Sequence, residues 1–242
     1  MITETLMISS RFCGPPQSGN GGYVSGRLAK HLPGPAVVRL RAPPPLDIAL
    51  QIEASEDEAR LIQGSTLIAE AHRCELEIEV PAAPSFDEAE DASRAYTGFI
   101  HHSFPTCFVC GPKRIAGDGM RIFPGLIRGS RVLAAPWTPD ASLADASGLV
   151  LTEFMWAALD CAGAFAVISA GLAEGNSILL GEIRARLNGT VAPGEPCVVI
   201  AWPEGADGRK HFACTAILSP SGNTVAVARA TWIEIPAAAV TS

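Results

Sequence analysis

The sequence is constrained most by an internal repeat. Each half contains a glycine turn, an apolar strand of small residues and an Ile-Glu-x-Pro exit. These copies are residues 64–71 with 78–81, and residues 222–229 with 233–236. Upstream of each copy, alternating arginines appear at residues 38–43 and 183–187. The repeat predicts two copies of one unit in a single chain, with a groove between them that takes different residues from each copy.

Composition narrows the class of protein further. The chain has 242 residues, of which 48% are hydrophobic and 18% charged, enough apolar residues for one large core or two small ones. The net charge of −7 argues against a broad nucleic-acid surface, which needs a basic face. We find no apolar run of the roughly 18 to 20 residues that spans a membrane, and no N-terminal export signal. The sequence therefore predicts a cytoplasmic protein without nucleic-acid or membrane partners.

Periodicity predicts a helix followed by antiparallel strands in each half. The helices are expected at residues 23–32 and 148–168. The strands are expected at 37–41, 48–54, 58–62 and 65–80, then at 177–187, 196–202, 211–218 and 224–235. One buried helix wrapped by a curved antiparallel sheet is the hotdog architecture. The predicted fold is thus α+β, a double hotdog, with units at residues 1–83 and 105–242 and a linker at 84–104.

Asn20, Gly21 and Gly22 precede the first predicted helix. Two glycines at a helix start allow close backbone approach and leave N–H groups free, where the helix dipole favours negative charge. Such N–H groups can polarise a carbonyl and stabilise an oxyanion. A flexible loop that simply enters the helix explains the same glycines.

Two carboxylates lie in the second, strongly apolar helix. Asp160 occupies its middle, where a carboxylate is costly unless it is paired or functional. Burial would raise its pKa and make it a better base near neutral pH. Glu153 lies about two turns earlier and is the second-choice acid or base. An Asp160 that merely bonds a neighbouring loop is the alternative.

At these residues the chain resembles the hotdog-fold acyl-CoA thioesterases, including the phenylacetate-pathway type. Members carry His-Gly-Gly at the start of the central helix, a carboxylate nine positions after the His, and a Cys-Phe-x-Cys-Gly-Pro stretch. This chain has Cys-Phe-Val-Cys-Gly-Pro at residues 107–112 and Gly-Met-Arg-Ile at 119–122. The resemblance covers nearly the whole chain as two copies.

The resemblance implies that the two copies are complementary. In the first, Asn20-Gly21-Gly22 takes the His-Gly-Gly place, but Ala29 stands where the carboxylate belongs. In the second, Asp160 takes the carboxylate place, but residues 151–153 carry no Gly-Gly. Because family sites join the glycine loop of one unit to the carboxylate of the other, one composite site per chain is implied.

The implied activity is thioester hydrolysis. Gly21 or Gly22 would polarise the carbonyl, and Asp160 would act as general base or as nucleophile. Polar candidates for orienting water or Asp160 are Thr152, Ser177 and Asn188, and Trp137 and Trp156 are candidates for the floor of the acyl pocket. Candidates for the CoA phosphates are Arg121, Arg184 and Arg186. CoA would be part of the substrate, and no other cofactor is expected.

Cys107 and Cys110, with His101 and His102 nearby, supply the ligand count of a zinc site. The two histidines are adjacent, however, and their spacing to Cys107 is unlike that of common zinc fingers. Structural packing is the favoured interpretation, so no metal site is predicted; zinc binding and a redox pair remain alternatives. The seven cysteines are expected to be mostly reduced.

Two other functions remain open. The degraded motifs fit a non-catalytic acyl-CoA or acyl-ligand binding protein of the same fold. A dehydratase or hydratase would need a helix histidine, and His31 at a helix end is the only one. By analogy with hotdog assemblies, a homodimer of double-hotdog chains is expected.

Overall fold

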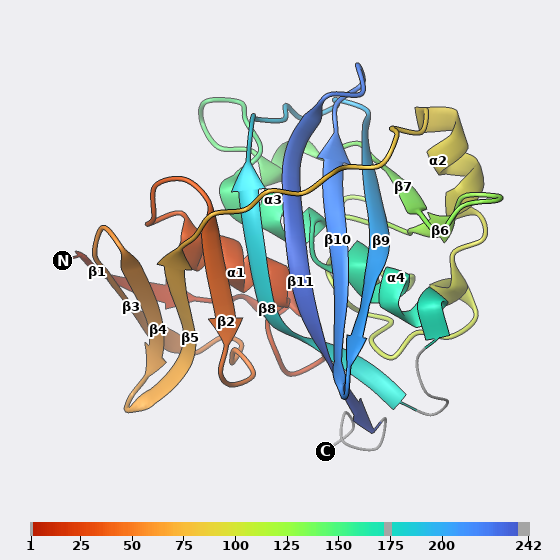
Figure 1. The fold of residues 1–242 in the computed structure, drawn as a ribbon. Coiled ribbons are helices and arrows are strands. Elements are labelled where there is room, and N and C mark those ends of the chain that lie inside the picture. Colours follow the sequence, from red (N-terminus) through yellow and green to blue (C-terminus); the bar gives the residue numbers. More distant parts are fainter. Residues whose placement is uncertain (1, 172–175, 237–242) are drawn as a thin grey trace.

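The computed structural model describes residues 2–171 and 176–236. Within them, eleven strands form one antiparallel sheet (Figure 1). The strands of the first half are β1 (Ile2–Met7), β2 (Ala36–Leu40), β3 (Ala49–Ala54), β4 (Glu58–Gln63) and β5 (Thr66–Arg73). Those of the second half are β6 (Gly125–Leu126), β7 (Leu133–Trp137), β8 (Asn176–Leu187), β9 (Cys197–Asp207), β10 (Lys210–Leu218) and β11 (Thr224–Pro236). The helices are α1 (Gly21–Ala29), α2 (Phe86–Ser93), α3 (Thr152–Ala158) and α4 (Cys161–Gly171).

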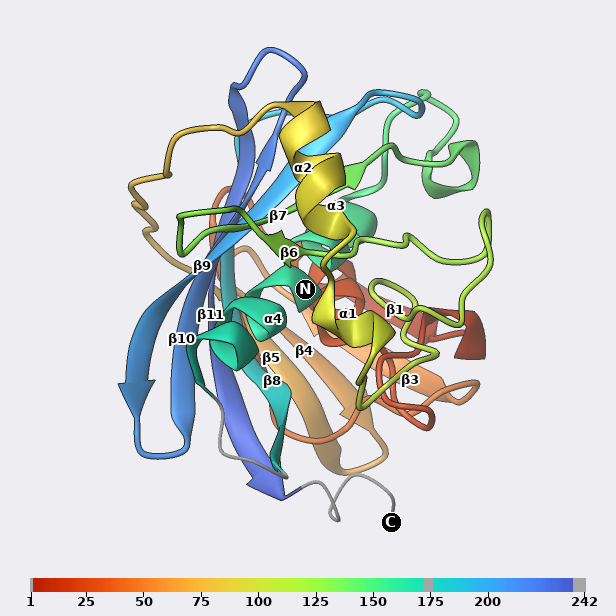
Figure 2. The same ribbon diagram turned by 90° about the vertical axis from the view of Figure 1, so that its right-hand side faces the viewer.

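The sheet is continuous across both halves of the sequence. Its order is β1-β3-β4-β5-β2-β8-β11-β10-β9-β7-β6, so each half keeps its strands together. The halves meet where β2 pairs with β8, with Ala36 opposite Ala185 and Arg39 opposite Glu182. Figure 2 shows α1, α3 and α4 packed on one side of this sheet. The α+β class and the antiparallel pairing agree with the prediction.

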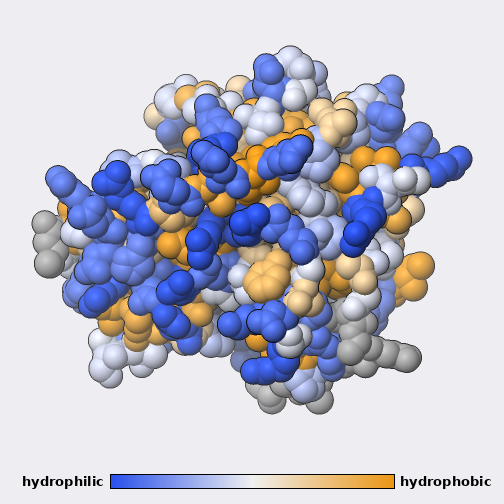
Figure 3. All heavy atoms as spheres, viewed as in Figure 1, coloured by the Kyte–Doolittle hydropathy of each residue, from blue (hydrophilic) through white to orange (hydrophobic). Residues whose placement is uncertain are grey.

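Alternating side chains explain the strands of the first half. In β3, Leu50, Ile52 and Ala54 are buried against the helices, whereas Gln51 is exposed. This alternation is typical of a sheet with one wet face. Seen from that face, the surface over these strands is largely hydrophilic (Figure 3). The register therefore places the core under the sheet, where α1 and α3 lie.

The predicted strand at 65–80 ends early, and the remainder becomes a strap. After Arg73, residues 74–84 cross the outer face of β8, β11, β10 and β9 (Figure 1). Leu76 packs in a small second core with Val198 and Val227, and Arg186 Nη1 donates to Leu76 O at 2.8 Å. The strap therefore covers the second-half strands on the face that is wet in the first half.

A helix forms inside the predicted linker. Ser85 caps α2 through a capping box with Glu88, which satisfies the first backbone donors of the helix. Ala89 and Ala92 are buried, and the backbone of Ala92 packs so closely on Gly125 that no side chain would fit there. Part of the predicted linker at residues 84–104 is therefore helical, and Ser-x-x-Glu at residues 85–88 is the local pattern that indicates this helix.

The long apolar helix predicted at 148–168 is broken in the middle. It becomes α3 and α4, separated by Leu159 and Asp160. By length and composition the stretch from Thr152 to Gly171 is apolar enough to span a membrane, contrary to the sequence-based expectation, yet 72% of its apolar window is buried inside the fold. Burial on this scale is what the central helix of a packed core shows.

Glycines let α1 and α3 cross at close range. A Cβ at Gly22 would lie 2.5 Å from Asp160 Cβ, and one at Gly26 would lie 2.5 Å from Glu153 Cα. Because Gly22 faces the end of α3 and Gly26 faces its beginning, the two helices run antiparallel. This contact fixes the position of Asp160 relative to the start of α1.

Candidate functional site

Asp160 lies at the break between α3 and α4. The break frees the carbonyl of Leu159 from its helical partner, and Thr215 Oγ1 on β10 donates to that oxygen at 2.8 Å. A buried carbonyl without such a donor would cost free energy comparable to a lost hydrogen bond. Thr215 therefore stabilises the local backbone turn that directs the Asp160 side chain toward α1.

The Asp160 carboxylate meets the glycine loop of the first half. Its Oδ2 accepts from Gly22 N–H at 2.8 Å and from Asn20 Nδ2 at 2.9 Å. Asn20 also caps α1, because its Oδ1 accepts from Tyr23 N–H at 2.9 Å. Three residues that the sequence singled out are thus in direct contact, although Asp160 is 140 positions from Asn20.

The surroundings of Asp160 raise its pKa to about 7. Burial is the largest cause, since the residue is only 2% exposed, and the neighbouring Cys107 adds to it. The hydrogen bonds from Gly22 and Asn20 act in the opposite direction. Oδ1 has no hydrogen-bond partner among the described residues. The carboxylate therefore exchanges a proton near neutral pH, with one oxygen held and the other unused.

A cavity of about 220 Å³ opens onto these groups. Its polar wall contains Asn20, Gly21 and Asp160. Its apolar wall is made by Ala164, Phe165 and Ile168 of α4, Ile178, Leu179 and Leu180 of β8, and Trp232 of β11. The shape suits a ligand with an apolar body and one polar group that reaches Asp160.

The two glycines have different roles. Gly22 N–H is bonded to Asp160, so it is not free for a ligand. Gly21 lines the cavity, and no backbone hydrogen bond of the described chain uses its N–H. As the first residue of α1, Gly21 presents this N–H at the positive end of the helix dipole. Of the two, Gly21 is therefore placed to polarise a carbonyl.

Glu153 is placed at the other end of the helix pair. It is 7% exposed, and its Oε1 lies 3.6 Å from Arg27 Nε. Glu153, Thr152 and Trp156 are not among the described residues that line the cavity. The structure thus places these three candidates outside the lining of the cavity that Asp160 reaches.

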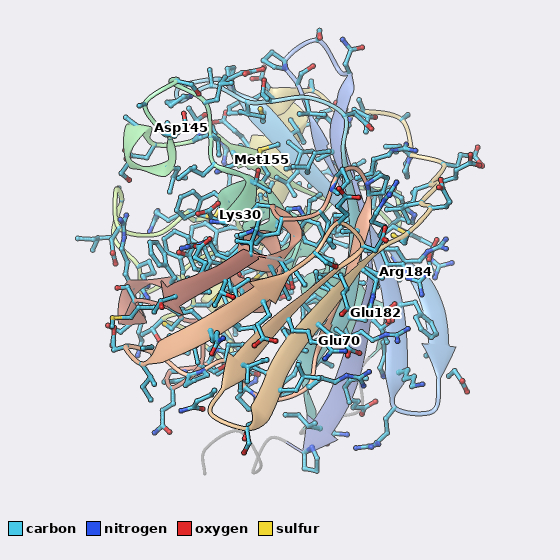
Figure 4. The ribbon with its side chains drawn as sticks, turned by 90° about the vertical axis from the view of Figure 1, so that its left-hand side faces the viewer. Lys30, Glu70, Asp145, Met155, Glu182 and Arg184 are labelled. Carbon is cyan, nitrogen blue, oxygen red and sulfur yellow. The ribbon has the colours of Figure 1, made fainter. Side chains whose placement is uncertain are left out.

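The three arginines proposed for CoA phosphates have partners within the chain. Arg184 Nε lies 2.9 Å from Glu182 Oε1, on the outer face of the sheet with Glu70 (Figure 4). Arg186 holds the strap, as described above. The guanidinium of Arg121 lies 5.0 Å from the Phe123 ring and donates to the backbone of Arg114. None of the three lines the cavity within the described part of the chain.

Tryptophan positions also differ from the prediction. Trp137 and Trp156 were expected to floor the pocket, but Trp232 is the tryptophan that lines the cavity. Trp137 lines a separate, more polar hollow of about 470 Å³ beside Arg11 and Arg121. Local sequence does not rank the four tryptophans, since their distance from Asp160 depends on strand order.

The linker contributes residues that the sequence analysis did not assign to the site. Ser103 Oγ lies 3.0 Å from Ser177 Oγ, and both line the cavity. Ser177 was a predicted polar candidate; Asn188 was another, but it donates to Thr224 O at the surface, away from the cavity. His102 and Phe104 also line the cavity. Placing these linker residues requires knowing that the chain returns to the helices after α2.

Cys107 and Cys110 lie beside Asp160 rather than in a separate packing cluster. Both line the cavity together with Cys161, the first residue of α4. The pKa of the Cys107 thiol is held well below its usual range, chiefly by hydrogen bonds from the Cys110 and Cys161 side chains. His102 Nε2 lies 3.3 Å from Cys110 Sγ, and all seven cysteines are free.

Comparison with solved structures identifies the fold. The tesB protein of Mycobacterium avium subs paratuberculosis matches with a TM-score of 0.62 at 13% identity, over 97% of this chain and 93% of that one. A hot dog fold protein of unknown function from Alicyclobacillus acidocaldarius matches with a TM-score of 0.60 at 12% identity, over 96% and 93%. The acyl-CoA thioesterase II TesB2 of Mycobacterium marinum matches with a TM-score of 0.58 at 13% identity, over 90% of each chain.

No protein-family model matches the chain, and no curated protein matches its sequence. The structural matches cover nearly the whole chain; one is described as having a hot dog fold, one is named a tesB protein and one an acyl-CoA thioesterase. At these identities they establish the hotdog fold and leave the activity to be argued from the site.

Proposed function

We propose that this chain is an acyl-CoA thioesterase with two hotdog units in one chain and one composite site between them. The observation that carries the proposal is the contact of Asp160 with Gly22 and Asn20, at 2.8 and 2.9 Å, at the wall of an apolar cavity. A carboxylate supplied by one half meets a helix N-terminus supplied by the other. The names of the structural neighbours add support, because two of the three are called tesB-type or acyl-CoA thioesterases.

The acyl group occupies the apolar cavity, and its thioester carbonyl accepts from Gly21 N–H. That donor stabilises the negative charge that develops on the oxygen when the carbonyl is attacked. Asp160 Oδ2 is held by Gly22 and Asn20, and Oδ1, which has no hydrogen-bond partner among the described residues, is the oxygen that reacts. The hydrogen bonds to Oδ2 fix the orientation of the carboxylate and leave Oδ1 available to react.

Asp160 can then drive hydrolysis by either of two routes. As general base, Asp160 removes a proton from water, the water oxygen adds to the carbonyl carbon, and the C–S bond breaks; the proton passes to the departing CoA sulfur. As nucleophile, Oδ1 itself adds to the carbonyl, CoA leaves, and water cleaves the resulting anhydride. One turnover in ¹⁸O-labelled water separates the two, because only the anhydride route can place ¹⁸O in the Asp160 side chain.

The rest of the proposal concerns substrate and setting. The substrate is an acyl-CoA, and the steps above use no cofactor beyond the CoA that it carries. Asp160 rather than Glu153 supplies the carboxylate, since Glu153 is paired with Arg27 away from the cavity. The enzyme works in the cytoplasm as a homodimer of these chains, without a nucleic-acid or membrane partner; this setting rests on composition and on analogy.

A binding protein for acyl-CoA is the second candidate. It is favoured by the small exposure of Asp160, 2%, which limits access of water. Such a protein would hold the acyl group in the same cavity without cleaving it.

One experiment separates the two candidates. Release of free thiol is measured with short, long and aromatic acyl-CoAs, beside equilibrium binding of the same compounds. Thiol release above the uncatalysed rate for at least one compound is expected. Saturable binding without release across the whole panel would support the binding protein, and neither binding nor release would refute both.

A further inference from the structure

Three cysteine side chains from distant parts of the chain converge beside the cavity. Cys107 and Cys110 come from the loop that follows the linker, and Cys161 begins α4. Their Sγ atoms all lie within 4.8 Å of one another, and those of Cys107 and Cys161 are 3.7 Å apart. The three residues are 3%, 3% and 7% exposed. Neither hydrolysis route uses them.

The loop that carries the first two cysteines is shaped around sulfur. Backbone N–H groups of Val109 and Cys110 point at the Cys107 side chain. Gly111 N–H donates to Cys107 O at 2.9 Å, and a Cβ at Gly111 would lie 2.5 Å from that oxygen. The Cys-x-x-Cys-Gly sequence thus forms a tight turn whose backbone donors favour a negatively charged sulfur.

The spacing of the sulfurs fits a tetrahedral metal. Thiolates bound to zinc at about 2.3 Å stand roughly 3.8 Å apart when the ion is tetrahedral. The 3.7 Å between Cys107 and Cys161 is that edge, and Cys110 needs only a small movement to complete the same face. Ordinary disulfides, by contrast, need sulfurs at about 2.05 Å.

Polar groups around the cluster donate toward the sulfurs. Asn20 Nδ2 lies 3.6 Å from Cys161 Sγ and 4.0 Å from Cys107 Sγ. His102 Nδ1 accepts from Phe104 N–H at 2.9 Å, so the ring proton is on Nε2, which faces Cys110 Sγ at 3.3 Å. His102 in this tautomer donates to sulfur and is not a ligand. N–H donors in this position are typical partners of metal-bound thiolates.

We propose that Cys107, Cys110 and Cys161 bind one thiophilic divalent cation, of the Zn²⁺ class, through three thiolates. All three cysteines line the cavity, so a water or another small ligand from that side completes the coordination. The ion joins the cysteine loop to the first residue of α4. It thereby fixes the backbone next to Asp160 and steadies the wall of the cavity. The proposal does not depend on thioester hydrolysis.

The test is the metal content of the purified full-length chain. We expect native mass spectrometry and elemental analysis to show one zinc ion per chain in protein prepared without chelator. Chain stripped of metal and loaded with Co²⁺ is expected to show sulfur-to-cobalt charge-transfer absorption, at one equivalent. Both signals should be lost in Cys161→Ser and Cys107→Ser.

Cys197→Ser is the matched control, because Cys197 is a fully buried cysteine of β9 that does not belong to the cluster. It should keep both signals. Absence of zinc together with no charge-transfer band from wild-type protein would overturn the proposal, and this readout does not require any variant to fold. Equal metal content in wild type and Cys161→Ser, or a wild-type mass lower by two hydrogens from a disulfide, would overturn it as well.

Discussion

The α1–α3 pair buries one carboxylate near each end, and the two are stabilised in different ways. At one end, Asp160 has two neutral donors, Gly22 N–H and Asn20 Nδ2, and forms no salt bridge with a side chain of the described residues. At the other end, Glu153 lies 3.6 Å from the guanidinium of Arg27. Burial is the main reason that the pKa of Asp160 is raised, and the two neutral donors only partly oppose it.

The difference begins with the residues that contact each carboxylate. Close glycines bring α1 onto α3 at both ends, Gly22 against Asp160 and Gly26 against Glu153. At the Asp160 end, the N-terminus of α1 and the cavity lie beside the carboxylate, whereas Glu153 lies in the first turn of its own helix, α3, and is not among the described residues that line the cavity. The comparison teaches that one helix pair can use close glycine contacts at both ends and still place the cavity beside only one of its two buried carboxylates among the described residues.

The largest expected effect comes from closing the glycine contact at the Asp160 end. In Gly22→Ala the new Cβ would lie 2.5 Å from Asp160 Cβ and 2.6 Å from Trp156 O, so the helices must separate. Such overpacking costs about 1–3 kcal/mol of unfolding free energy. Because Asp160 is displaced as well, turnover by the folded fraction should fall about a hundredfold.

Gly26→Ala is the control for this variant. Its Cβ would lie 2.5 Å from Glu153 Cα, so urea unfolding should show a similar loss of stability. Turnover of the folded Gly26→Ala protein should stay within a few-fold of wild type, because the displaced residue, Glu153, lies outside the site. Equal loss of turnover in both variants would mean that helix separation alone, at either end, disables the enzyme.

A smaller effect is expected from Asn20→Ser. Serine still caps α1 by accepting from Tyr23 N–H, but it is too short to donate to Asp160 as Asn20 Nδ2 does. Losing this hydrogen bond should lower the unfolding free energy by about 1.5–3 kcal/mol, and because Asp160 is then oriented less firmly, kcat/KM should fall roughly 10- to 100-fold. Unchanged kcat/KM would show that Asn20 serves only as a cap.

The ion-pair end should respond in stability and not in turnover. Arg27→Met removes the cation near both Glu153 and Glu4, which lie 3.6 and 3.5 Å away, and should lower the unfolding free energy by about 1 kcal/mol. Adding Glu153→Gln to that variant removes the uncompensated charge and should recover part of the loss. Thermal unfolding measures both; a further loss in the double variant would contradict the pairing.

The smallest effect concerns pH at the same end. Burial, followed by the charge of Lys30, lowers the pKa of His31 below its ordinary value of 6.5, although Glu4 acts in the opposite direction. Below pH 6.5 the unfolded chain therefore binds a proton that the folded chain resists, and His31 destabilises the fold as pH falls. In His31→Asn, urea unfolding between pH 7.5 and about 5.5 should show a shallower loss of stability. A steeper loss would reverse the sign.

Much of the fold follows from local pattern. The alternation in β3 and the turn residues of the second half predict the antiparallel strands. Side chains alternate between the two faces of a strand, so the apolar positions show which face is buried. The end of β5 at Arg73 could not be predicted in this way. The next residues, 74–80, keep a strand-like pattern, but they contact the outer sheet face and have no strand partner.

The sequence predicts individual residues of the candidate site better than it predicts the long-range contacts that hold them in place. Asn20, Gly22 and Asp160 stand out because a buried carboxylate and a glycine-rich helix start are locally unusual. The helix break at Asp160 depends on Thr215, 56 residues from Leu159, and the third cysteine of the cluster is 54 residues from Cys107. Such long-range partners leave no local signal.

The most direct test of the account is the initial rate of CoA release by wild type, Asp160→Asn and Glu153→Gln, measured on the best acyl-CoA of the panel at one pH. Asparagine keeps the size of Asp160 but provides no base or nucleophile, so its rate should fall about 10²- to 10⁴-fold, while Glu153→Gln stays within a few-fold of wild type. Retained turnover in Asp160→Asn would contradict the assignment of the chemistry to Asp160. Loss of turnover in Glu153→Gln alone would contradict it as well.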